Sequence, residues 1–285
     1  MIVGNNTVGF VGLGQMGLPM AKHIIASGRT VIGWSRSAEE RAAFAEAGGT
    51  VVETLAEVGV CPIVLSIVFD DDAVREVVLG PGGLATTLSR GAVHVAMETI
   101  SPALAREVRD ALAKRGVLHL SSPVFGPPHV AEAAELKFNC SGTREAFDAA
   151  EPILDTMGGT FWFGPEPEQA LLVKLMGNNM IFTIIELMYE AFTFLAAGGV
   201  KEADVKRMLI DRLFQSPIIT GYANYFSANP GAQPPFDANP IPRKDNSLCL
   251  GAAEQMGIDL SLVGLVQEKM SEAWRPQPSN SPEDN

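Results

Sequence analysis

Hydrophobic runs with the two-residue period of strands alternate with apolar positions at helical spacing from Thr7 to about Phe163. This alternation predicts the α/β class, with a mostly parallel, doubly wound sheet covered by helices on both faces. Ligands of such a sheet bind outside the carboxyl ends of its strands. The strands are predicted at Thr7–Val11, Thr30–Trp34, Thr50–Val52, Ile63–Val68, Ala92–Met97, Val117–Leu120, Lys137–Ser141 and Thr160–Phe163.

The longest helical pattern runs from about Glu168 to Ala197 and is apolar on almost every side. A helix of this kind has to be buried. A membrane span is not expected, because the pattern holds no uncharged run of about 20 residues. We therefore predict an all-α second domain centred on this helix, which ends at Gly198-Gly199 and needs a partner subunit to become buried. The polar residues that interrupt the pattern are Lys174, Asn178, Asn179, Glu186 and Glu190.

The last third of the chain completes the predicted domain organisation. A proline-rich segment, Asn229 to Pro242, cannot form regular structure and is either a wall of an active site or a spacer. The polar residues Pro276 to Asn285 are expected to be disordered. Further helices are predicted at about Glu202–Phe214, Lys244–Met256 and Leu260–Trp274. The predicted parts are thus a first domain over residues 1–165, a helical domain over residues 166–275 and a tail over residues 276–285.

Composition and charge narrow the range of partners. Of the 285 residues 47% are hydrophobic and 19% are charged, as in a soluble protein, and the length suits two domains. The net charge of −12 argues against nucleic acid or an anionic membrane surface as partner. The three cysteines lie far apart in sequence and predict reduced core residues without a metal site. The N-terminus does not resemble a signal peptide, so we expect a cytoplasmic protein.

A glycine-rich turn joins the first predicted strand to the first predicted helix. Gly12, Gly14 and Gly17 have the spacing G-x-G-x-x-G. The first glycine permits the tight turn, the second lets a pyrophosphate approach the backbone, and the third lets the helix pack closely on the strand. The helix N-terminus offers its N–H groups to the phosphates. We therefore predict a Rossmann-type dinucleotide site formed by Gly12, Leu13, Gly14, Gln15, Met16 and Gly17.

The end of the second strand favours NADP over NAD. NAD-binding proteins carry an acidic residue there for the ribose 2′-hydroxyl, whereas this chain has Ser35, Arg36 and Ser37. A guanidinium flanked by two hydroxyls suits a 2′-phosphate through a charge-assisted contact. In the alternative reading, Arg36 is an ordinary surface arginine and Ser37 is only the N-cap of a helix that begins near Glu39.

Lys174 and Asn178 are the strongest candidates for chemistry. They are four residues apart in the long helix and therefore lie on one face of it, where both can contact one small molecule. Burial of an ammonium group favours its neutral form, which suits a general acid or base for the oxygen of an alcohol or a carbonyl. The alternative is a lysine that extends to the surface beside an asparagine that caps a backbone group.

Several motifs occur in the order that is typical of one enzyme family. Over nearly its whole length the chain resembles the β-hydroxyacid dehydrogenases, which include 3-hydroxyisobutyrate dehydrogenases and tartronate semialdehyde reductases. The resemblance implies a Rossmann domain, a helical domain that forms a homodimer through the helix 168–197, and hydride transfer at C4 of a nicotinamide cofactor. The motifs are Met16-Gly17-Leu18-Pro19-Met20-Ala21 in the glycine loop, Thr99-Ile100-Ser101-Pro102, Pro123-Val124 with Gly126, Lys174-x-x-x-Asn178 and Lys244-Asp245.

The resemblance also implies roles for single residues. Lys174 would be the catalytic acid or base, and Asn178 would contact the substrate. Thr99 would lie beside the nicotinamide ribose or ring, and Lys244 would close over the cofactor from the second domain. Three loops follow the carboxyl ends of predicted strands and can therefore reach the nicotinamide. They are Ser66–Asp72, which contains Val68, Met97–Pro102 and Ser121–Pro128.

Two departures from the family pattern affect the substrate. Glu98 stands where the family usually has serine, and Phe125-Gly126-Pro127 replaces a Ser-Gly-Gly that holds a carboxylate. Phenylalanine has no side-chain donor and proline has no N–H. A carboxylate at Glu98 would repel an anionic substrate and favour a cationic or neutral one. In the alternative, Glu98 turns away and pairs with Arg106 or another surface base. The expected substrate residues are Glu98, Phe125, Gly126 and Asn178.

The motifs leave three functions open. The first is NADPH-dependent hydride transfer to or from a small carbonyl or hydroxy compound. The second is imine reduction, as in the related imine reductases and reductive aminases, many of which carry aspartate or tyrosine where this chain has Lys174. The third is an NADPH-binding protein without activity, which Lys174 and Asn178 argue against. The four histidines form no Ser-His-Asp pattern, and only His129 is expected near the substrate.

Overall fold

The computed structural model describes residues 6–229, 232–236 and 240–273 and divides the chain into two compact units, Met1–Lys174 and Leu175–Asn285. The predicted domain boundary at residue 165 precedes helix α9 (Glu168–Ala197), whereas the division between the units falls inside this helix. The predicted disordered tail, residues 276–285, lies outside the described residues. So do residues 230–231 and 237–239 of the proline-rich segment.

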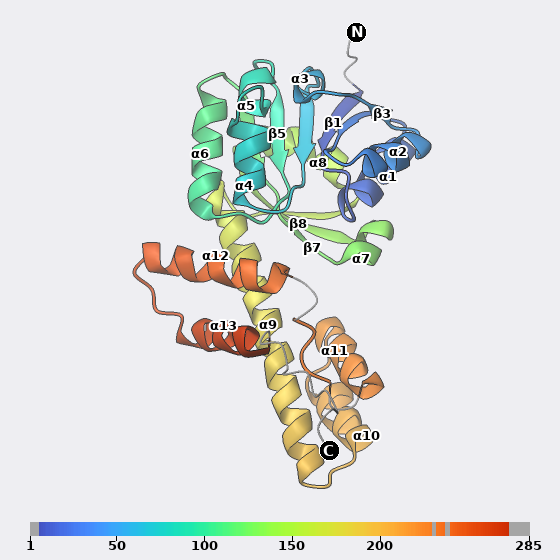
Figure 1. Ribbon diagram of the computed structural model, residues 1–285, viewed down its shortest axis with the longest axis vertical. Coiled ribbons are helices and arrows are strands. Elements are labelled where there is room, and N and C mark those ends of the chain that lie inside the picture. Colours follow the sequence, from blue (N-terminus) through green and yellow to red (C-terminus); the bar gives the residue numbers. More distant parts are fainter. Residues whose placement is uncertain (1–5, 230–231, 237–239, 274–285) are drawn as a thin grey trace, which may run out of the picture. The chain divides into compact units, whose positions relative to one another are not determined.

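The first unit is built on one sheet that contains nine strands in the described part of the chain (Figure 1). The order is β3-β2-β1-β4-β5-β6-β8-β7, with β9 paired to β8. The neighbours from β3 to β6 are parallel, whereas β8 is antiparallel to β6 and β7. The strands are β1 (Thr7–Val11), β2 (Thr30–Trp34), β3 (Thr50–Val51), β4 (Ile63–Ser66), β5 (Val93–Ala96), β6 (Leu118–Ser121), β7 (Val124–Phe125), β8 (Leu136–Gly142) and β9 (Gly158–Trp162).

This strand order confirms the predicted doubly wound fold. The chain crosses from β1 to β2 on one side and continues later with β4 on the other, so the carboxyl ends of β1 and β4 flank the point at which such sheets bind ligands. Strand β7 was not predicted, because two residues are too few to show a period. The short helix α7 (Pro128–Glu132), which follows it, was also not predicted.

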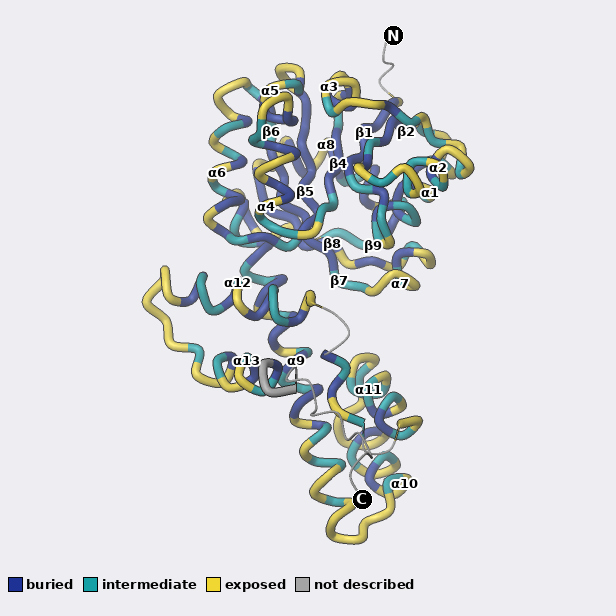
Figure 2. The backbone as a smooth tube through the Cα atoms, viewed as in Figure 1, coloured by how far each residue is buried: buried dark blue, intermediate teal, exposed yellow. Residues whose placement is uncertain are grey.

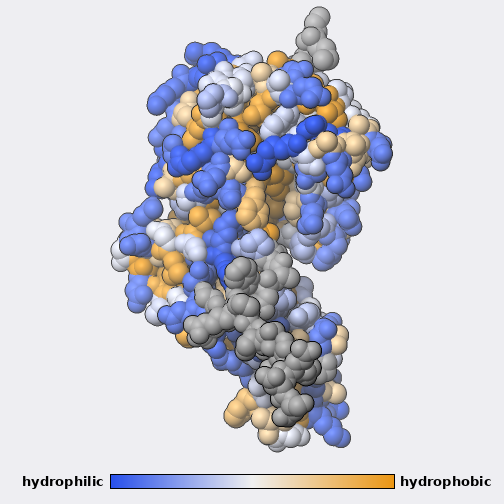
Figure 3. Space-filling view, viewed as in Figure 1, coloured by the Kyte–Doolittle hydropathy of each residue, from blue (hydrophilic) through white to orange (hydrophobic). Residues whose placement is uncertain are grey.

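Side chains alternate between the two faces of the sheet. One face, which we call the apolar face, carries Val8, Phe10, Leu65, Val95 and Leu120 and packs on α1 (Gly17–Ala26), α2 (Ala38–Glu46), α7 and α8 (Arg144–Leu154). Each fully buried side chain of this size stabilises the fold by about 1.5–3 kcal/mol. Figure 2 shows the central strands β1, β4 and β5 as deeply buried, and Figure 3 shows hydrophilic residues over much of the surface of this unit.

The opposite face, which we call the mixed face, packs on another set of helices. Its apolar residues, among them Val11, Val64 and Val117, form a second cluster with these helices and with Leu171 of α9. Its polar residues are Ser66, His94, Glu98, His119 and Ser121, all of them buried. The covering helices are α3 (Leu55–Val58), α4 (Asp71–Val74), α5 (Leu84–Thr87) and α6 (Pro102–Ala113).

The second unit is entirely helical in its described residues. Its core combines Phe182 and Ile185 of α9 with residues of four later segments, including Phe226 and Met270. The helix α11 was not predicted, because Gly221, aromatic residues and β-branched residues obscure its period. It begins at Pro217, and Ser216 caps it by accepting the N–H of Ile219 at 3.1 Å. The elements are α10 (Glu202–Val205), a π-helix (Lys206–Leu213), α11 (Pro217–Ala228), α12 (Ile241–Gln255) and α13 (Ser261–Ala273).

Helix α9 keeps an exposed apolar stripe in the second unit. By length and composition it is long and apolar enough to cross a membrane. Polar residues nevertheless recur along it every one to two turns, between Lys174 and Glu190. Four large apolar residues recur at spacings of four and seven, which places them on one side of a helix. These residues and their exposed fractions are Met176 (38%), Met180 (61%), Leu187 (63%) and Phe194 (78%).

Candidate active site

The glycine loop between β1 and α1 has the geometry that a pyrophosphate requires. Gly12 has a φ of +91°, and a Cβ there would lie 2.1 Å from the Ile67 carbonyl oxygen. A Cβ on Gly17 would lie 1.9 Å from the Gly12 carbonyl oxygen, so only glycine fits at either position. At Gly14 a Cβ would meet only the Glu40 side chain, at 3.2 Å, which leaves the backbone open to a ligand.

The other residues of the glycine loop have side chains that lie in the core or in solvent, so only their backbone groups face the expected phosphate site. Leu13 is buried in the core of the apolar face and Met16 packs against the same core, whereas Gln15 is exposed. Helix α1 has no acidic residue in its own first turn, and the carboxylate nearest to Gly14 is that of Glu40 of α2, which accepts a hydrogen bond from Ser35. The residues present therefore fit a dinucleotide.

The end of β2 carries charges of both signs. The Ser35 hydroxyl donates to the Glu40 carboxylate, and the exposed Arg36 pairs with Glu76 at 3.3 Å. Ser37 caps α2 by accepting the N–H of Glu40, so the predicted N-cap is present, and the helix begins at Ala38. Arg41, which the sequence analysis did not single out, donates to the Ser35 carbonyl at 2.6 Å. Two guanidinium groups, of Arg36 and Arg41, and two carboxylates, of Glu40 and Glu76, therefore lie around the end of β2, where the ribose 2′-substituent is expected.

The three loops that were predicted to reach the nicotinamide follow neighbouring strands, so they begin at the same edge of the sheet. The register pairs Ser66 with Ala96 and Ala96 with Ser121 at the carboxyl ends of β4, β5 and β6. Val68 and Thr99, which follow β4 and β5, are both partly buried. A Cβ on Gly12 would lie 3.5 Å from a methyl group of Val68, so the loop after β4 lies against the glycine loop.

Glu98 is buried at the carboxyl end of β5 and is 3% exposed. The Ser66 hydroxyl lies 3.1 and 3.2 Å from its two carboxyl oxygens. The alternative in which Glu98 pairs with Arg106 is wrong, because Arg106 contacts Glu168 instead, at 3.4 Å. Burial raises the pKa of the Glu98 carboxyl to about 8, although hydrogen bonds from backbone groups and from Ser66 act in the opposite direction. At neutral pH Glu98 is therefore mostly uncharged, which weakens the expected repulsion of an anionic substrate.

Two histidines extend the contacts of Ser66 along the mixed face. His94 Nε2 lies 2.9 Å from Ser66 Oγ, His94 Nδ1 lies 3.2 Å from His119 Nδ1, and His119 Nε2 lies 3.4 Å from Ser121 Oγ. Burial lowers the pKa of His94 to about 4, and burial followed by the charges of His94 and Arg109 lowers the pKa of His119 well below its ordinary value. These histidines were not predicted to have a role in the site. The available signal was their position on β5 and β6, which the register pairs directly.

Lys174 lies near the start of α9 and is 8% exposed. Ser141 of β8 fixes this end of the helix, because its hydroxyl accepts the Ala170 N–H at 2.8 Å and donates to the Pro167 carbonyl at 2.9 Å. Lys174 Nζ lies 4.3 Å from the centroid of the Phe125 ring, within the range of a cation–π contact. The alternative in which this lysine extends to the surface is therefore wrong. The neighbouring Gly126 has a φ of +136° and packs on Leu136.

In the second unit α9 and α12 hold three polar residues together. Asn178, 8% exposed, donates from Nδ2 to the Asp245 carboxylate at 2.6 Å. Lys244 Nζ lies 2.8 Å from the other oxygen of Asp245, which is 1% exposed. Asp245 therefore orients the Asn178 amide, a role that the adjacent Lys244-Asp245 pair in the sequence did not reveal. The predicted contact of Lys244 with a cofactor stays a prediction.

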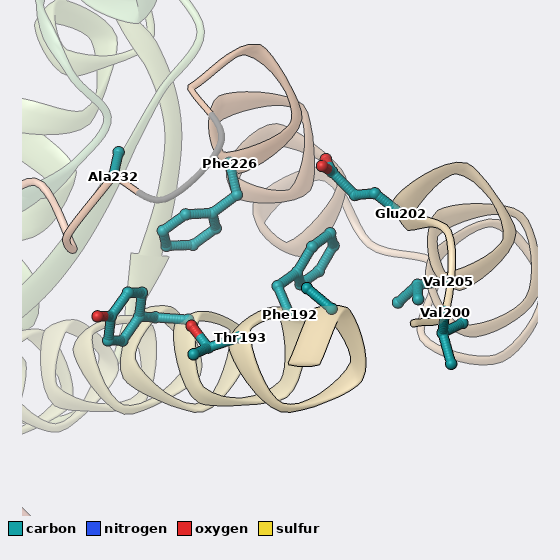
Figure 4. Close-up of a pocket in the computed structure, with 9 residues that line it drawn as sticks. Phe192, Thr193, Val200, Glu202, Val205, Phe226 and Ala232 are labelled. Carbon is teal, nitrogen blue, oxygen red and sulfur yellow. The ribbon is translucent and has the colours of Figure 1, made fainter. Parts of the chain in front are cut away.

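A cavity of about 240 Å³ lies elsewhere in the second unit (Figure 4). Tyr189 and Phe192 of α9, Phe226 of α11 and the Glu202 side chain contribute to its wall, and none of the predicted site residues lines it. Among the described residues no group of three or more His, Cys, Asp and Glu side chains is arranged to hold a metal ion. The three cysteines are buried and free.

Comparisons with known proteins agree on the class of protein. The model of the NAD binding domain of 6-phosphogluconate dehydrogenase matches residues 7–164. An uncharacterized oxidoreductase of Bacillus subtilis, YfjR, is 28% identical over 91% of both chains. The fold matches a Mycobacterium tuberculosis 3-hydroxyisobutyrate dehydrogenase with a TM-score of 0.80 and 22% identity, over 94% of this chain and 93% of that one. It matches an imine reductase of Bacillus cereus with a TM-score of 0.66 and 20% identity, over 94% and 92%.

Proposed function

This chain belongs to the β-hydroxyacid dehydrogenase family, and from that premise we propose that it uses NADPH to transfer hydride to or from a small carbonyl or hydroxy compound, with Lys174 as general acid or base. Its membership makes it an NAD(P)-dependent oxidoreductase of the group that contains 3-hydroxyisobutyrate dehydrogenases and imine reductases. The observation that carries the finer proposal is the buried Lys174 ammonium over the ring of Phe125.

The residues of the glycine loop and of the strand ends would hold the cofactor. Gly12, Gly14 and the N-terminus of α1 receive the pyrophosphate, and Val68 and Thr99 lie on the loops that receive the nicotinamide half. When bound, the reduced nicotinamide supplies a hydride to the carbon of the substrate. NADPH is favoured by Arg36 and Arg41 at the end of β2, because the ion pair of Arg36 with Glu76 is exposed and therefore weak enough for a phosphate to replace it.

Lys174 meets the requirements of the proton donor. A lysine on the first turns of a helix that Ser141 anchors to the sheet is held in place, and its burial strengthens any hydrogen bond to a substrate oxygen. Asn178 follows one turn later on the same side of α9, where its amide can contact the same oxygen. Asp245 keeps that amide from rotating.

The test is NADPH consumption by the wild-type protein and by Lys174→Ala with a panel of aldehydes and ketones, each with and without an added amine. We expect carbonyl compounds alone to be reduced and Lys174→Ala to lose about a hundredfold in kcat, the scale of a removed acid or base. Lys114→Ala, which removes an exposed lysine of the first unit, should keep full activity.

Imine reduction is the second candidate, and the loop after β7 favours it. Phe125 has no side-chain donor and Pro127 has no N–H to offer a carboxylate, so these two residues do not favour an acidic substrate. Turnover that appears only with added amine and survives Lys174→Ala would replace the first candidate by the second. Tight NADPH binding without turnover of any compound would instead favour a non-catalytic NADPH-binding protein.

A homodimer through helix 168–197 completes the proposal. The exposed stripe of Met176, Met180, Leu187 and Phe194 is typical of an interface between subunits, since a soluble monomer rarely leaves such a stripe in water. Leu187→Glu should convert a dimer to a monomer in light scattering, whereas the equally exposed Met208→Glu, outside α9, should not. The acidic net charge and the three free cysteines support a cytoplasmic location.

A further inference from the structure

The mixed face of the sheet carries a continuous line of hydrogen-bonding side chains in an otherwise apolar core. We call this line the buried chain. Each member is at most 6% exposed, and burial of so many polar groups costs free energy unless they are hydrogen-bonded to one another. In order along the sheet the buried chain consists of Glu98, Ser66, His94, His119 and Ser121.

The arrangement does not suit a nucleophile. In a nucleophilic triad the histidine lies between the serine and the acid, whereas here Ser66 lies between Glu98 and His94. Ser66 is also fully buried, so no substrate can reach it. A serine between an acid and an imidazole can pass a proton from one to the other, because a hydroxyl both donates and accepts.

We propose that the buried chain is a proton relay that supplies Glu98, at the carboxyl end of β5, with protons. The proposal rests on the proposed reduction, in which Lys174 gives one proton to the substrate oxygen for each hydride transferred. In the relay Glu98 gives its proton to replace the one that Lys174 has lost, and the buried chain then reprotonates the Glu98 carboxylate. Glu98 lies in the loop that precedes Thr99, beside the place where the reaction is expected. His119 is 6% exposed and is the more open of the two histidines, so protons enter at its end of the chain, through Ser121.

The proton balance of the relay closes without any stable charge. Ser121 takes a proton from water and gives its hydroxyl proton to His119 Nε2, and His119 gives its Nδ1 proton to His94 Nδ1. His94 then gives its Nε2 proton to Ser66 Oγ, and Ser66 gives its hydroxyl proton to the Glu98 carboxylate. Every group between the ends keeps its number of protons, and both histidines change tautomer. The low pKa values of the histidines and the high pKa of Glu98 agree with a chain that is neutral at pH 7.

Few charged groups act on the buried chain from the covering elements. Arg109 of α6 acts on His119, and it is itself paired with Asp110 at 2.9 Å and with Glu166 at 2.7 Å. Glu98 is contacted by Ser66 and by backbone N–H groups, including that of Val68. A pH effect that depends on Ser66 can therefore be assigned to the chain.

The first test compares Ser66→Ala, which breaks the chain, with Ser66→Thr, which keeps a hydroxyl. At pH 8.5, where solvent protons are scarce, Ser66→Ala should lose about tenfold in kcat with an unchanged KM for NADPH, and the loss should be smaller at pH 6. Ser66→Thr should stay close to the wild type. A loss in Ser66→Ala that is equal at every pH would overturn the relay.

The second test does not need activity. Nitrogen-15 NMR of labelled histidines should show both rings neutral at pH 7, with His94 and His119 carrying their protons on different nitrogens, and both patterns should change in Ser66→Ala and Glu98→Gln. Unchanged histidine signals in these variants would contradict the relay even in a protein that reduces carbonyl compounds. Failure of the substrate panel together with the expected NMR signals would contradict the proposed function and leave the proton relay supported.

Discussion

The two faces of the sheet share their strands, yet they differ in what they bury. On β4 and β5 the neighbours Leu65 and Ser66, and Val95 and His94, point to opposite sides. The apolar face is hydrophobic, whereas the mixed face carries buried histidines within β5 and β6 and buried serines at the carboxyl ends of β4 and β6. The difference indicates that one face mainly stabilises the fold, while the other gives up part of that stabilisation at the edge where ligands are expected.

The largest effect should come from removing bulk on the apolar face. Phe138 of β8 is fully buried there, and Phe138→Ala should lower the free energy of unfolding by about 3–5 kcal/mol because it leaves a cavity. Phe161 of the neighbouring β9 is 53% exposed, so Phe161→Ala should change it by no more than about 0.5 kcal/mol. Urea unfolding measures both. Equal losses would show that burial on this face is not the source of stability.

A pH-dependent effect should distinguish the mixed face. Because the folded pKa of Glu98, about 8, exceeds its ordinary value of 4.5, the native state binds a proton that the unfolded state releases. The stability contributed by this proton is complete below pH 4.5 and is lost as the pH rises to about 8. Relative to Glu98→Gln, the wild type should therefore lose up to about 1.4 kcal/mol per pH unit across this window.

The measurement is thermal or urea unfolding of both proteins between pH 5 and pH 8. The opposite titration of His94, whose lowered pKa costs stability as the pH falls, is shared by both proteins and largely cancels. Glu53→Gln, at an exposed position of the same unit, should follow the wild type at every pH. Parallel curves for the wild type and Glu98→Gln would mean that Glu98 is ionised in the folded protein.

A smaller effect, on the affinity for NADPH, is expected from a residue outside both faces, at the end of β2. Arg36→Ala should weaken NADPH binding about tenfold, the loss of one charge-assisted contact in water, and should leave NADH binding unchanged. Fluorescence titration of both nucleotides gives the two dissociation constants, and Arg90→Ala, at another exposed arginine of the first unit, is the control. An equal loss for NADPH and NADH would place Arg36 away from the 2′-phosphate.

The sequence predicted the apolar face better than the mixed face. Alternating valines and leucines define strands and the period of helices, so β1 and β2 were located to the residue. The glycine spacing likewise identified the turn after β1, in which Gly12 has the positive φ that favours glycine. Strand β7 and helix α11 escaped prediction because a short strand and a helix with glycine and β-branched residues have no clear period.

The polar contacts could not be predicted because they depend on register between distant strands. Ser66, His94 and His119 are separated by more than 20 residues from one another, and the predicted fold makes their strands neighbours without giving the register that brings the side chains into contact. The same is true of Asn178 and Asp245, which are 67 residues apart. Lys174 was found because a charged residue in an apolar helix is unusual, but its contact with Phe125 required the fold.

Variants of Leu65 and Ser66 test most directly whether the two faces of the sheet have different roles. These adjacent residues of β4 are both fully buried, and they lie on opposite faces. The measurement is kcat for NADPH-dependent carbonyl reduction at pH 8.5, corrected for the folded fraction, in Leu65→Ala and Ser66→Ala. We predict that Leu65→Ala loses about 3 kcal/mol of stability and keeps its kcat, whereas Ser66→Ala loses less stability and about tenfold in kcat. An equal loss of kcat in both variants, or full activity in Ser66→Ala, would contradict the division of roles between the two faces.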